Sequence, residues 1–184
     1  MELDAVVIAE VATPHTRPSI GLNGYSSFMK RAWKNPRPTL AAYGAPLVAS
    51  PRRDMDLEEA LARALVAARR DPVLVLSVPV VLLDNARTLD SRKLVRAARQ
   101  HGVASELGMM LDLTAKVGGR RTFARLARLL PKRTGRPAYY PRALGGRRGR
   151  ALADRNTPPV VARWGFRMNE TEDDLRTFVD KHRA

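Results

Sequence analysis

Cysteine is absent from this chain of 184 residues, which excludes disulfides, zinc sites with cysteine ligands and catalysis by a thiol. Aromatic residues make up only 5% of the chain, so we expect a core of alanine, leucine and valine. The longest apolar run, residues 72–83, is shorter than the roughly 18 residues that a membrane-spanning helix needs. The N-terminus carries acids where a signal peptide has basic residues. We therefore expect a cytoplasmic protein with no membrane association.

Acidic residues are almost missing from residues 118–167, which we call the cationic stretch. It holds 14 lysine and arginine residues and a single acid, Asp154, so it carries +13 of the chain's net +15. A bias toward arginine codons would explain arginine in place of lysine, but it would not explain the loss of acids from one stretch. A field of one sign over this length attracts polyanions such as nucleic acid or an acidic protein surface.

The clearest regular pattern lies in residues 57–130, where apolar residues recur with the spacing of a helix face. Asp56 precedes this region and Glu59 follows three residues later. This spacing predicts a helix with Asp56 as its N-cap and the Glu59 carboxylate reaching back. The predicted fold class is mainly α, a small helical bundle over about 57–130.

Residues 73–83 leave two alternatives open. Their valines favour a strand, while the Asp71-Pro72 pair before them is typical of a helix start. Pro79 would kink a helix or restrict a strand to the edge of a sheet. Because the neighbouring segments are helical, we favour a kinked, buried helix.

Two consecutive segments, 90–101 and 104–117, have the spacing of a helix-turn-helix, with Asp90 as the first cap and Gly102 at the turn. The second helix of that motif reads the major groove with polar residues. Here its charged residues are two acids and Lys116, so a hairpin of core helices is favoured. A row of three arginines at helical spacing on the first segment either extends the cationic surface or is an ordinary solvated face; these are Arg92, Arg96 and Arg99.

The flanks of this bundle have a different composition. Residues 1–56 are rich in proline and glycine, and we expect an irregular arm with a short strand at 3–11 and a short helix around 26–33. Residues 131–167, the basic segment, carry five prolines and a run of glycine and arginine. That composition disfavours packed structure by itself.

Residues 168–184 are predicted to form an amphipathic helix that docks on the core or on a partner. Thr171 and Asp174 have the spacing of a capping box, and acids in the first turn with cations in the last suit the helix dipole. The apolar residues that we predict to bind a partner are Leu175, Phe178 and Val179.

The strongest functional signal is the set of aromatic residues among the arginines of the cationic stretch. Guanidinium groups match phosphate in shape and charge, and aromatic rings stack on unpaired bases. In the alternative interpretation, the stretch is a solvated basic tail whose aromatic side chains anchor it to the core. The residues that we predict to contact nucleic acid are Arg121, Arg125, Arg128, Lys132, Arg136, Tyr139, Tyr140, Arg142, Arg147, Arg148, Arg150 and Trp164.

Catalytic motifs find little support in the sequence. The three histidines lie far apart without an HExxH pattern, and neither GxGxxG nor GxxxxGK[ST] occurs. We predict no catalytic residue, no metal and no cofactor, and favour a protein that is not an enzyme. An enzyme would need a pocket that gathers several separated acids beside a basic residue; the candidates are Asp84, Asp90, Glu106 and Asp112.

The leading hypothesis is a non-enzymatic nucleic-acid-binding or regulatory protein whose cationic stretch binds the phosphate backbone of RNA or DNA. The alternative is a protein-partner module, such as an antitoxin-like protein that masks an acidic or nucleic-acid-handling toxin. A short helical domain with a charged, proline-rich extension is similar in plan to antitoxins and other small bacterial regulators. That analogy rests on the plan alone and carries no site residues.

Overall fold

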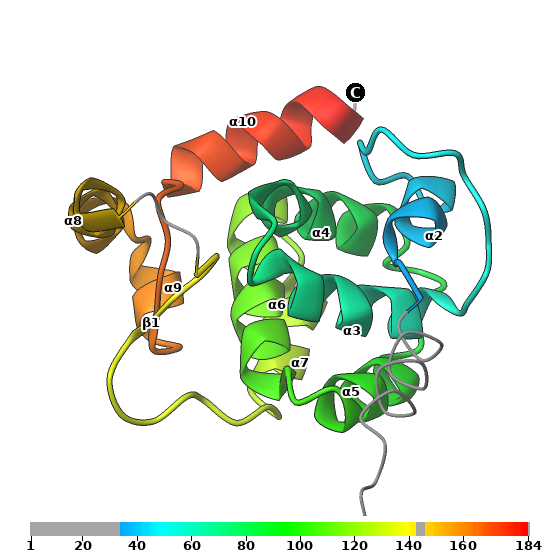
Figure 1. The fold of residues 1–184 in the computed structure, drawn as a ribbon. Coiled ribbons are helices and arrows are strands. Elements are labelled where there is room, and N and C mark those ends of the chain that lie inside the picture. The colour runs from blue at the N-terminus through cyan, green and yellow to red at the C-terminus, as the bar shows by residue number, and fades with distance from the viewer. Residues whose placement is uncertain (1–33, 143–145, 184) are drawn as a thin grey trace, which may run out of the picture. The chain divides into compact units, whose positions relative to one another are not determined.

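The computed structural model describes residues 34–142 and 146–183. The body considered below is the compact unit Asn35–Ala184. Within the described residues it is mainly helical, which confirms the predicted fold class (Figure 1). The strand expected at 3–11 and the helix expected around 26–33 lie outside the described residues.

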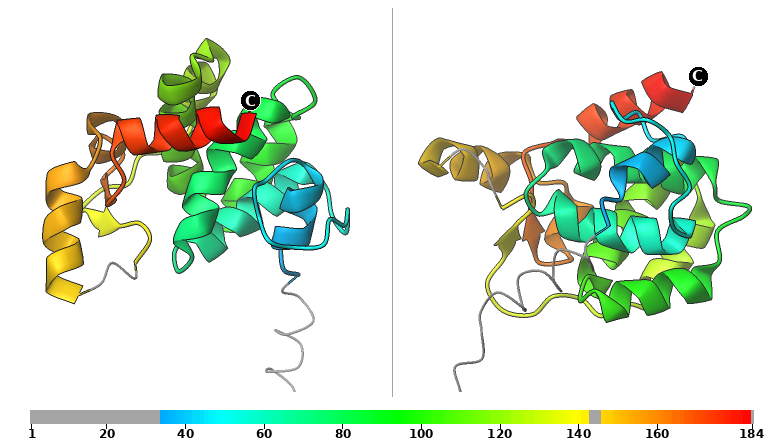
Figure 2. Two further views of the ribbon diagram at one scale, coloured as in Figure 1. Left: turned by 90° about the horizontal axis from the view of Figure 1, so that it is seen from above. Right: turned by 45° about the vertical axis from the view of Figure 1, so that its right-hand side comes forward.

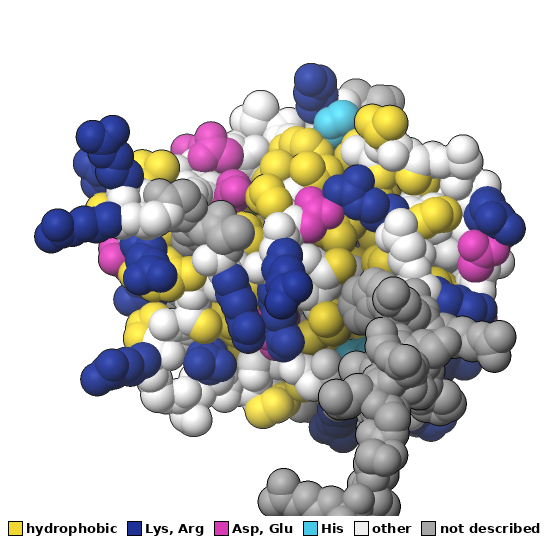
Figure 3. Space-filling view, in the orientation of Figure 1, with side chains coloured by type: hydrophobic (Ala, Val, Ile, Leu, Met, Phe, Trp, Pro, Cys, Tyr) yellow, Lys and Arg dark blue, Asp and Glu magenta, His cyan; other side chains and the backbone are white. Residues whose placement is uncertain are grey.

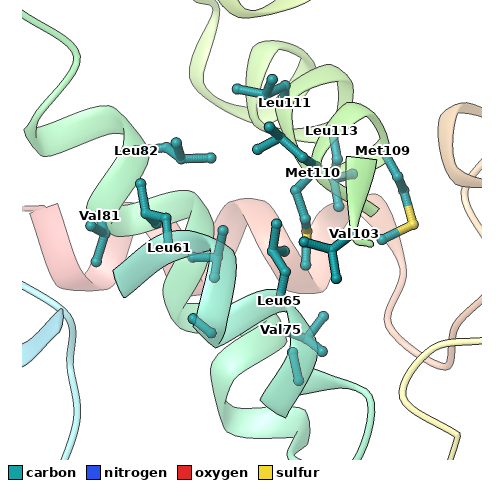
Figure 4. Close-up of a cluster of buried hydrophobic side chains, with 14 of the residues drawn as sticks. Leu61, Leu65, Val75, Val81, Leu82, Val103, Met109, Met110, Leu111 and Leu113 are labelled. Carbon is teal, nitrogen blue, oxygen red and sulfur yellow. The ribbon is translucent and has the colours of Figure 1, made fainter. Parts of the chain in front are cut away.

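Three helices form the centre of the bundle: α3 (Leu57–Ala68), α4 (Pro72–Asp84) and α6 (Ala104–Gly118). α4 contacts α3, α6 and α10, and its residues are buried from Leu74 to Leu83 except for half-buried Leu76. Figure 4 shows leucine, valine and methionine side chains from these helices meeting in one cluster. A helix enclosed on several sides needs apolar residues all around, which is why α4 lacks a polar stripe.

The sequence left strand and helix open at 73–83, and the helical alternative is confirmed, with Pro79 inside α4. The side chain of Asp71 accepts a hydrogen bond from the backbone N–H of Val73. Pro72 occupies the first turn, where the missing N–H is not needed. The local start signal therefore decides the structure of this valine-rich run.

The other helices lie around this centre (Figures 1 and 2). Their bounds are α2 (Arg37–Ala42), α5 (Ser91–Gln100), α7 (Arg121–Ala127), α8 (Gly146–Asn156), α9 (Pro159–Ala162) and α10 (Glu172–Arg183). α5 contacts α3 and α6, α7 and α9 pack against α6, and α10 lies on α4 and α6. The hairpin of α5 and α6 is thus part of the core, as the sequence favoured.

Three of the four predicted helix starts carry a side-chain cap, and Asp71 before α4 is the first of them. The Asp90 side chain accepts hydrogen bonds from Arg92 and Lys93 N–H groups, and Thr171 and Asp174 bond reciprocally at the start of α10. Asp56 occupies the N-cap position of α3 without a side-chain capping bond, so that part of the prediction is wrong.

Glu59 does not reach back to the start of α3 as the sequence predicts. It accepts a hydrogen bond from Arg63 and lies 2.9 Å from Nε2 of His101, at the end of α5. Arg63 lies one turn further along α3, and His101 comes from a distant part of the sequence. Glu59 therefore joins α3 to α5.

The basic segment 131–167 is folded onto the bundle where it is described. It contains α8, α9 and two short parallel strands, with β1 (Ala138–Tyr139) paired to β2 (Phe166–Arg167). Its composition alone disfavours packing, but large side chains from it are buried in the main core; they are Tyr140, Val160, Val161, Trp164 and Phe166. Contacts to α3 and α6 supply the stability that the composition lacks.

Across the described residues, no helix combines the length and the apolar character needed to cross a membrane. α4, the most apolar of them, has 13 residues and is enclosed by other helices.

Candidate nucleic-acid interface

Trp164 fixes the basic segment on the bundle. Its side chain is 2% exposed and lies on α6, where Gly108 leaves room for the indole ring. The indole Nε1 donates a hydrogen bond to Oδ2 of Asp112 at 3.0 Å. Gly108 and Asp112 are four residues apart on one helix face, so together they form the seat of this tryptophan.

Tyr140 makes a second anchor. It is 1% exposed, and its hydroxyl donates to the carbonyl of Leu65 at 2.8 Å. Burial, with the nearby charge of Glu106, raises the pKa of Tyr140 well above its ordinary value. Tyr140 and Trp164 were predicted to stack on bases or to anchor the segment. In this structure both side chains are enclosed, so they serve as anchors and offer no free ring face.

Nearly all the cations of the cationic stretch point into solvent. Thirteen of the 14 are exposed, and Arg167, the remaining one, is half-buried beside Asp154 at 3.5 Å. Among the thirteen, Arg163 pairs with Asp112 at 3.3 Å. The other twelve form no ion pair with any acid in the described part of the chain; they are Arg120, Arg121, Arg125, Arg128, Lys132, Arg133, Arg136, Arg142, Arg147, Arg148, Arg150 and Arg155. Their charge is available to an external anion.

Two adjoining depressions lie where α7 and α9 meet α6; together we call them the α7–α9 hollow. Their volumes are about 220 and 230 Å³, and both are lined by Asp112, Ala124 and Arg163. The cations around the hollow are Lys116, Arg121, Arg128, Lys132 and Arg163. Asp112, the one acid among the described lining residues, is already engaged by Trp164 and Arg163. The hollow therefore has the charge and dimensions to receive phosphate groups.

α8 presents a second group of cations. Arg147, Arg148 and Arg155 are exposed, while Ala153 is fully buried. At 100° per residue the three arginines lie on the helix side opposite Ala153, so packing and charge occupy opposite faces. Figure 3 shows dark blue side chains gathered where α8 lies, and Figure 2 shows that helix at the margin of the body.

Tyr139 lies beside Arg150, another arginine of α8. It is half-buried, its hydroxyl donates to the Asp154 carboxylate at 3.1 Å, and the Arg150 guanidinium lies 5.7 Å from its ring centre. Desolvation and the bond to Asp154 raise the pKa of Tyr139. Tyr139 thus orients Arg150, and its ring is already covered on one side by a cation.

The structure divides the predicted contacts on α7 and just after it between two depressions. Arg121, Arg128 and Lys132 line the α7–α9 hollow, whereas Arg125 faces a separate groove beside α5. Lys116 and Arg163 line the hollow but were not among the predicted contacts. Lys116 lies in the last turn of α6, and Arg163 comes from a later part of the sequence and pairs with Asp112 on α6. Helical spacing within α7 therefore could not indicate either residue.

The predicted partner-binding residues lie on the inner face of α10. Leu175 and Val179 are each 1% exposed against the bundle, and Phe178 is half-buried with its ring 4.5 Å from that of His182. α10 is also held by the ion pair of Arg183 with Asp84 at 2.8 Å. The helix docks on its own core, and this apolar stripe is covered there.

The acids considered for catalysis occupy separate places. Asp84 pairs with Arg183, Asp90 caps α5, Glu106 pairs with Arg69, and Asp112 binds Trp164. No three His, Asp or Glu side chains in the described ranges gather as metal ligands would. The arrangement provides cations for binding anions, and each of these four acids has a separate partner.

Glu59 and Glu170 have pKa values shifted in opposite directions. Burial opposes ionisation of Glu59, but hydrogen bonds from Arg63 and His101 outweigh it and lower the pKa of Glu59. Burial raises the pKa of Glu170, whose Oε2 has no hydrogen-bond partner among the described residues. Neither group lines the α7–α9 hollow.

Comparison with known proteins gives no family to assign. The chain matches no protein-family model, and neither a curated protein nor a solved structure is significantly similar to it.

Proposed function

We propose that this chain is a non-enzymatic binding protein that holds the phosphate backbone of a nucleic acid on the α7–α9 hollow and on α8. The supporting observation is the set of twelve exposed cations without an acidic partner in the described part of the chain. Unpaired positive charges concentrated on one part of a protein favour binding of a polyanion.

Backbone contacts, without base stacking, form the basis of this proposal. The two fully enclosed aromatic residues, Tyr140 and Trp164, offer no ring to a base, and Tyr139 is engaged by Arg150 and Asp154. The binding should therefore depend on salt and vary little with sequence. A duplex, whose phosphates are regularly spaced and fixed, is the preferred target.

A charge-reversal pair tests the proposal. Arg121→Glu with Arg128→Glu changes two residues of the hollow, and Arg87→Glu with Lys181→Glu makes the same charge change at exposed sites outside the cationic stretch. Fluorescence anisotropy with labelled duplex DNA should show a loss of about tenfold or more for the first pair and at most about threefold for the second. Equal losses for both pairs would contradict a defined interface, because net charge alone would then govern binding.

A further inference from the structure

A second hollow lies between α5 and α7, separate from the α7–α9 hollow; we call it the α5–α7 groove. It has a volume of about 870 Å³. Its lining residues are Ser91, Arg92, Val95, Arg96, Arg99, Gln100, Arg125, Leu126 and Leu129. None of these described lining residues is acidic, so the groove combines positive charge with an apolar floor.

The floor of the groove is an aliphatic surface in contact with water. Leu129 is 71% exposed, and Val95 and Leu126 are half-buried. Leu129 is one of the few large apolar side chains that the described residues leave exposed. Because water contact with such a surface is unfavourable, the floor gains stability when another apolar surface covers it.

The rim carries cations at a helical spacing. Arg92, Arg96 and Arg99 follow one another at intervals of four and three residues on α5, which covers about 10.5 Å along the axis. Arg125 on α7 lines the same groove. None of these four makes an ion pair with an acid in residues 34–142 or 146–183. Carboxylates at the same intervals on a second helix would meet the α5 row one by one.

We propose that the α5–α7 groove binds an acidic amphipathic helix of a partner protein. Such a helix supplies an apolar stripe for Val95, Leu126 and Leu129 and flanking Asp or Glu side chains for the arginines. A nucleic acid would use only the arginines of the groove, because no aromatic residue among its described lining offers a ring for base stacking and phosphates gain nothing from exposed leucine. None of the described lining residues of this groove lines the α7–α9 hollow.

A synthetic peptide provides the probe for this site. The peptide is a labelled 16-residue helix with glutamates at intervals of four and three residues beside a leucine stripe, and its controls are a scrambled sequence and a version with lysine for glutamate. The designed peptide should bind with a dissociation constant below about 100 μM, and both controls should bind at least about tenfold more weakly. Absence of binding, or equal binding of the scrambled peptide, would overturn the proposal.

Two groove variants and one control locate the binding. Leu129→Asn and Arg96→Glu should each lower the affinity for the peptide by about tenfold, while the circular dichroism spectrum of the folded protein stays unchanged. Arg128 lines the α7–α9 hollow. Arg128→Glu should therefore change the affinity for the peptide by no more than about twofold and should lower the affinity for duplex DNA. If Leu129→Asn and Arg96→Glu lower the affinity for duplex DNA and leave the affinity for the peptide unchanged, the groove is part of the nucleic-acid surface and the inference is wrong.

Discussion

Gly108 on α6 and the indole ring of Trp164 are in direct contact, with no space for a side chain between them. A methyl group at Gly108 would lie 2.2 Å from Cζ3 of Trp164, far inside normal contact distance. Since Trp164 holds the basic segment on the bundle, this glycine supports the position of cations that come much later in the sequence.

Gly108→Ala should destabilise the fold. In an open helix this change would gain about 1 kcal/mol, but here the new methyl group must displace a buried ring, which costs about 1–3 kcal/mol or more. Urea unfolding followed by circular dichroism measures the change. Trp164→Leu should cost less in the Gly108→Ala background than in the wild type; strictly additive effects would show that the two residues do not interact.

Substitutions of Asp112 should lower the stability of the fold and raise the affinity for duplex DNA. Asp112→Ala removes the acceptor of the Trp164 indole N–H and should cost about 1–3 kcal/mol, whereas Asp112→Asn keeps an acceptor oxygen and should cost less. Both changes remove the acid of the α7–α9 hollow, so both should tighten binding to duplex DNA. Urea melts and anisotropy titrations of the two variants test this, and weaker DNA binding by Asp112→Asn would contradict the assigned role of the hollow.

Glu59 should stabilise the fold in a pH-dependent way. Its folded pKa is lowered by the bonds from Arg63 and His101 that overcome its burial, so its contribution is present above the unfolded value, about 4.3, and is lost as pH falls through the folded pKa. Glu59→Gln should therefore be less stable than the wild type at pH 7, and the difference should vanish at strongly acidic pH. Thermal melts across pH measure it; a difference that persists unchanged in acid would exclude this ionic contribution.

Glu170 should act in the opposite direction. Burial raises its folded pKa, so the stability of its neutral form is present below the unfolded value, about 4.3, and is lost as pH rises through the folded pKa. Glu170→Gln, which stays neutral, should melt at a higher temperature than the wild type at pH 7 and should lose that advantage in acid. Glu172→Gln, an exchange of the same kind on α10, is the control, because it removes a carboxylate that pairs with Arg176 at 2.8 Å and should therefore not raise the melting temperature.

Local signals in the sequence were sufficient for much of the fold. Asp71, Asp90 and Thr171 mark helix starts whose partners lie within three residues, and these caps form. The helical state of 73–83 also followed from its start signal and its neighbours. Glu59 was assigned incorrectly because its second partner, His101, comes from the end of another helix.

The candidate site was less accessible from the sequence. The density of cations in 118–167 was evident, and the structure leaves thirteen of them exposed. The sequence could not show whether the aromatic side chains are buried or exposed. Trp164 and Tyr140 are held by Gly108, Asp112 and Leu65, which lie on helices distant in sequence. Long-range packing of this kind leaves no periodic trace in the segment that it fixes.

The proposed phosphate-binding function can be tested by the salt dependence of duplex DNA binding. A labelled duplex is titrated with the protein by fluorescence anisotropy at several salt concentrations. If the exposed cations hold phosphates, the logarithm of the association constant should fall linearly with the logarithm of salt concentration, with a slope steeper than about −3, since each phosphate contributes about −0.9. A slope shallower than about −1, or no measurable binding near physiological salt, would contradict a phosphate-binding function for this surface.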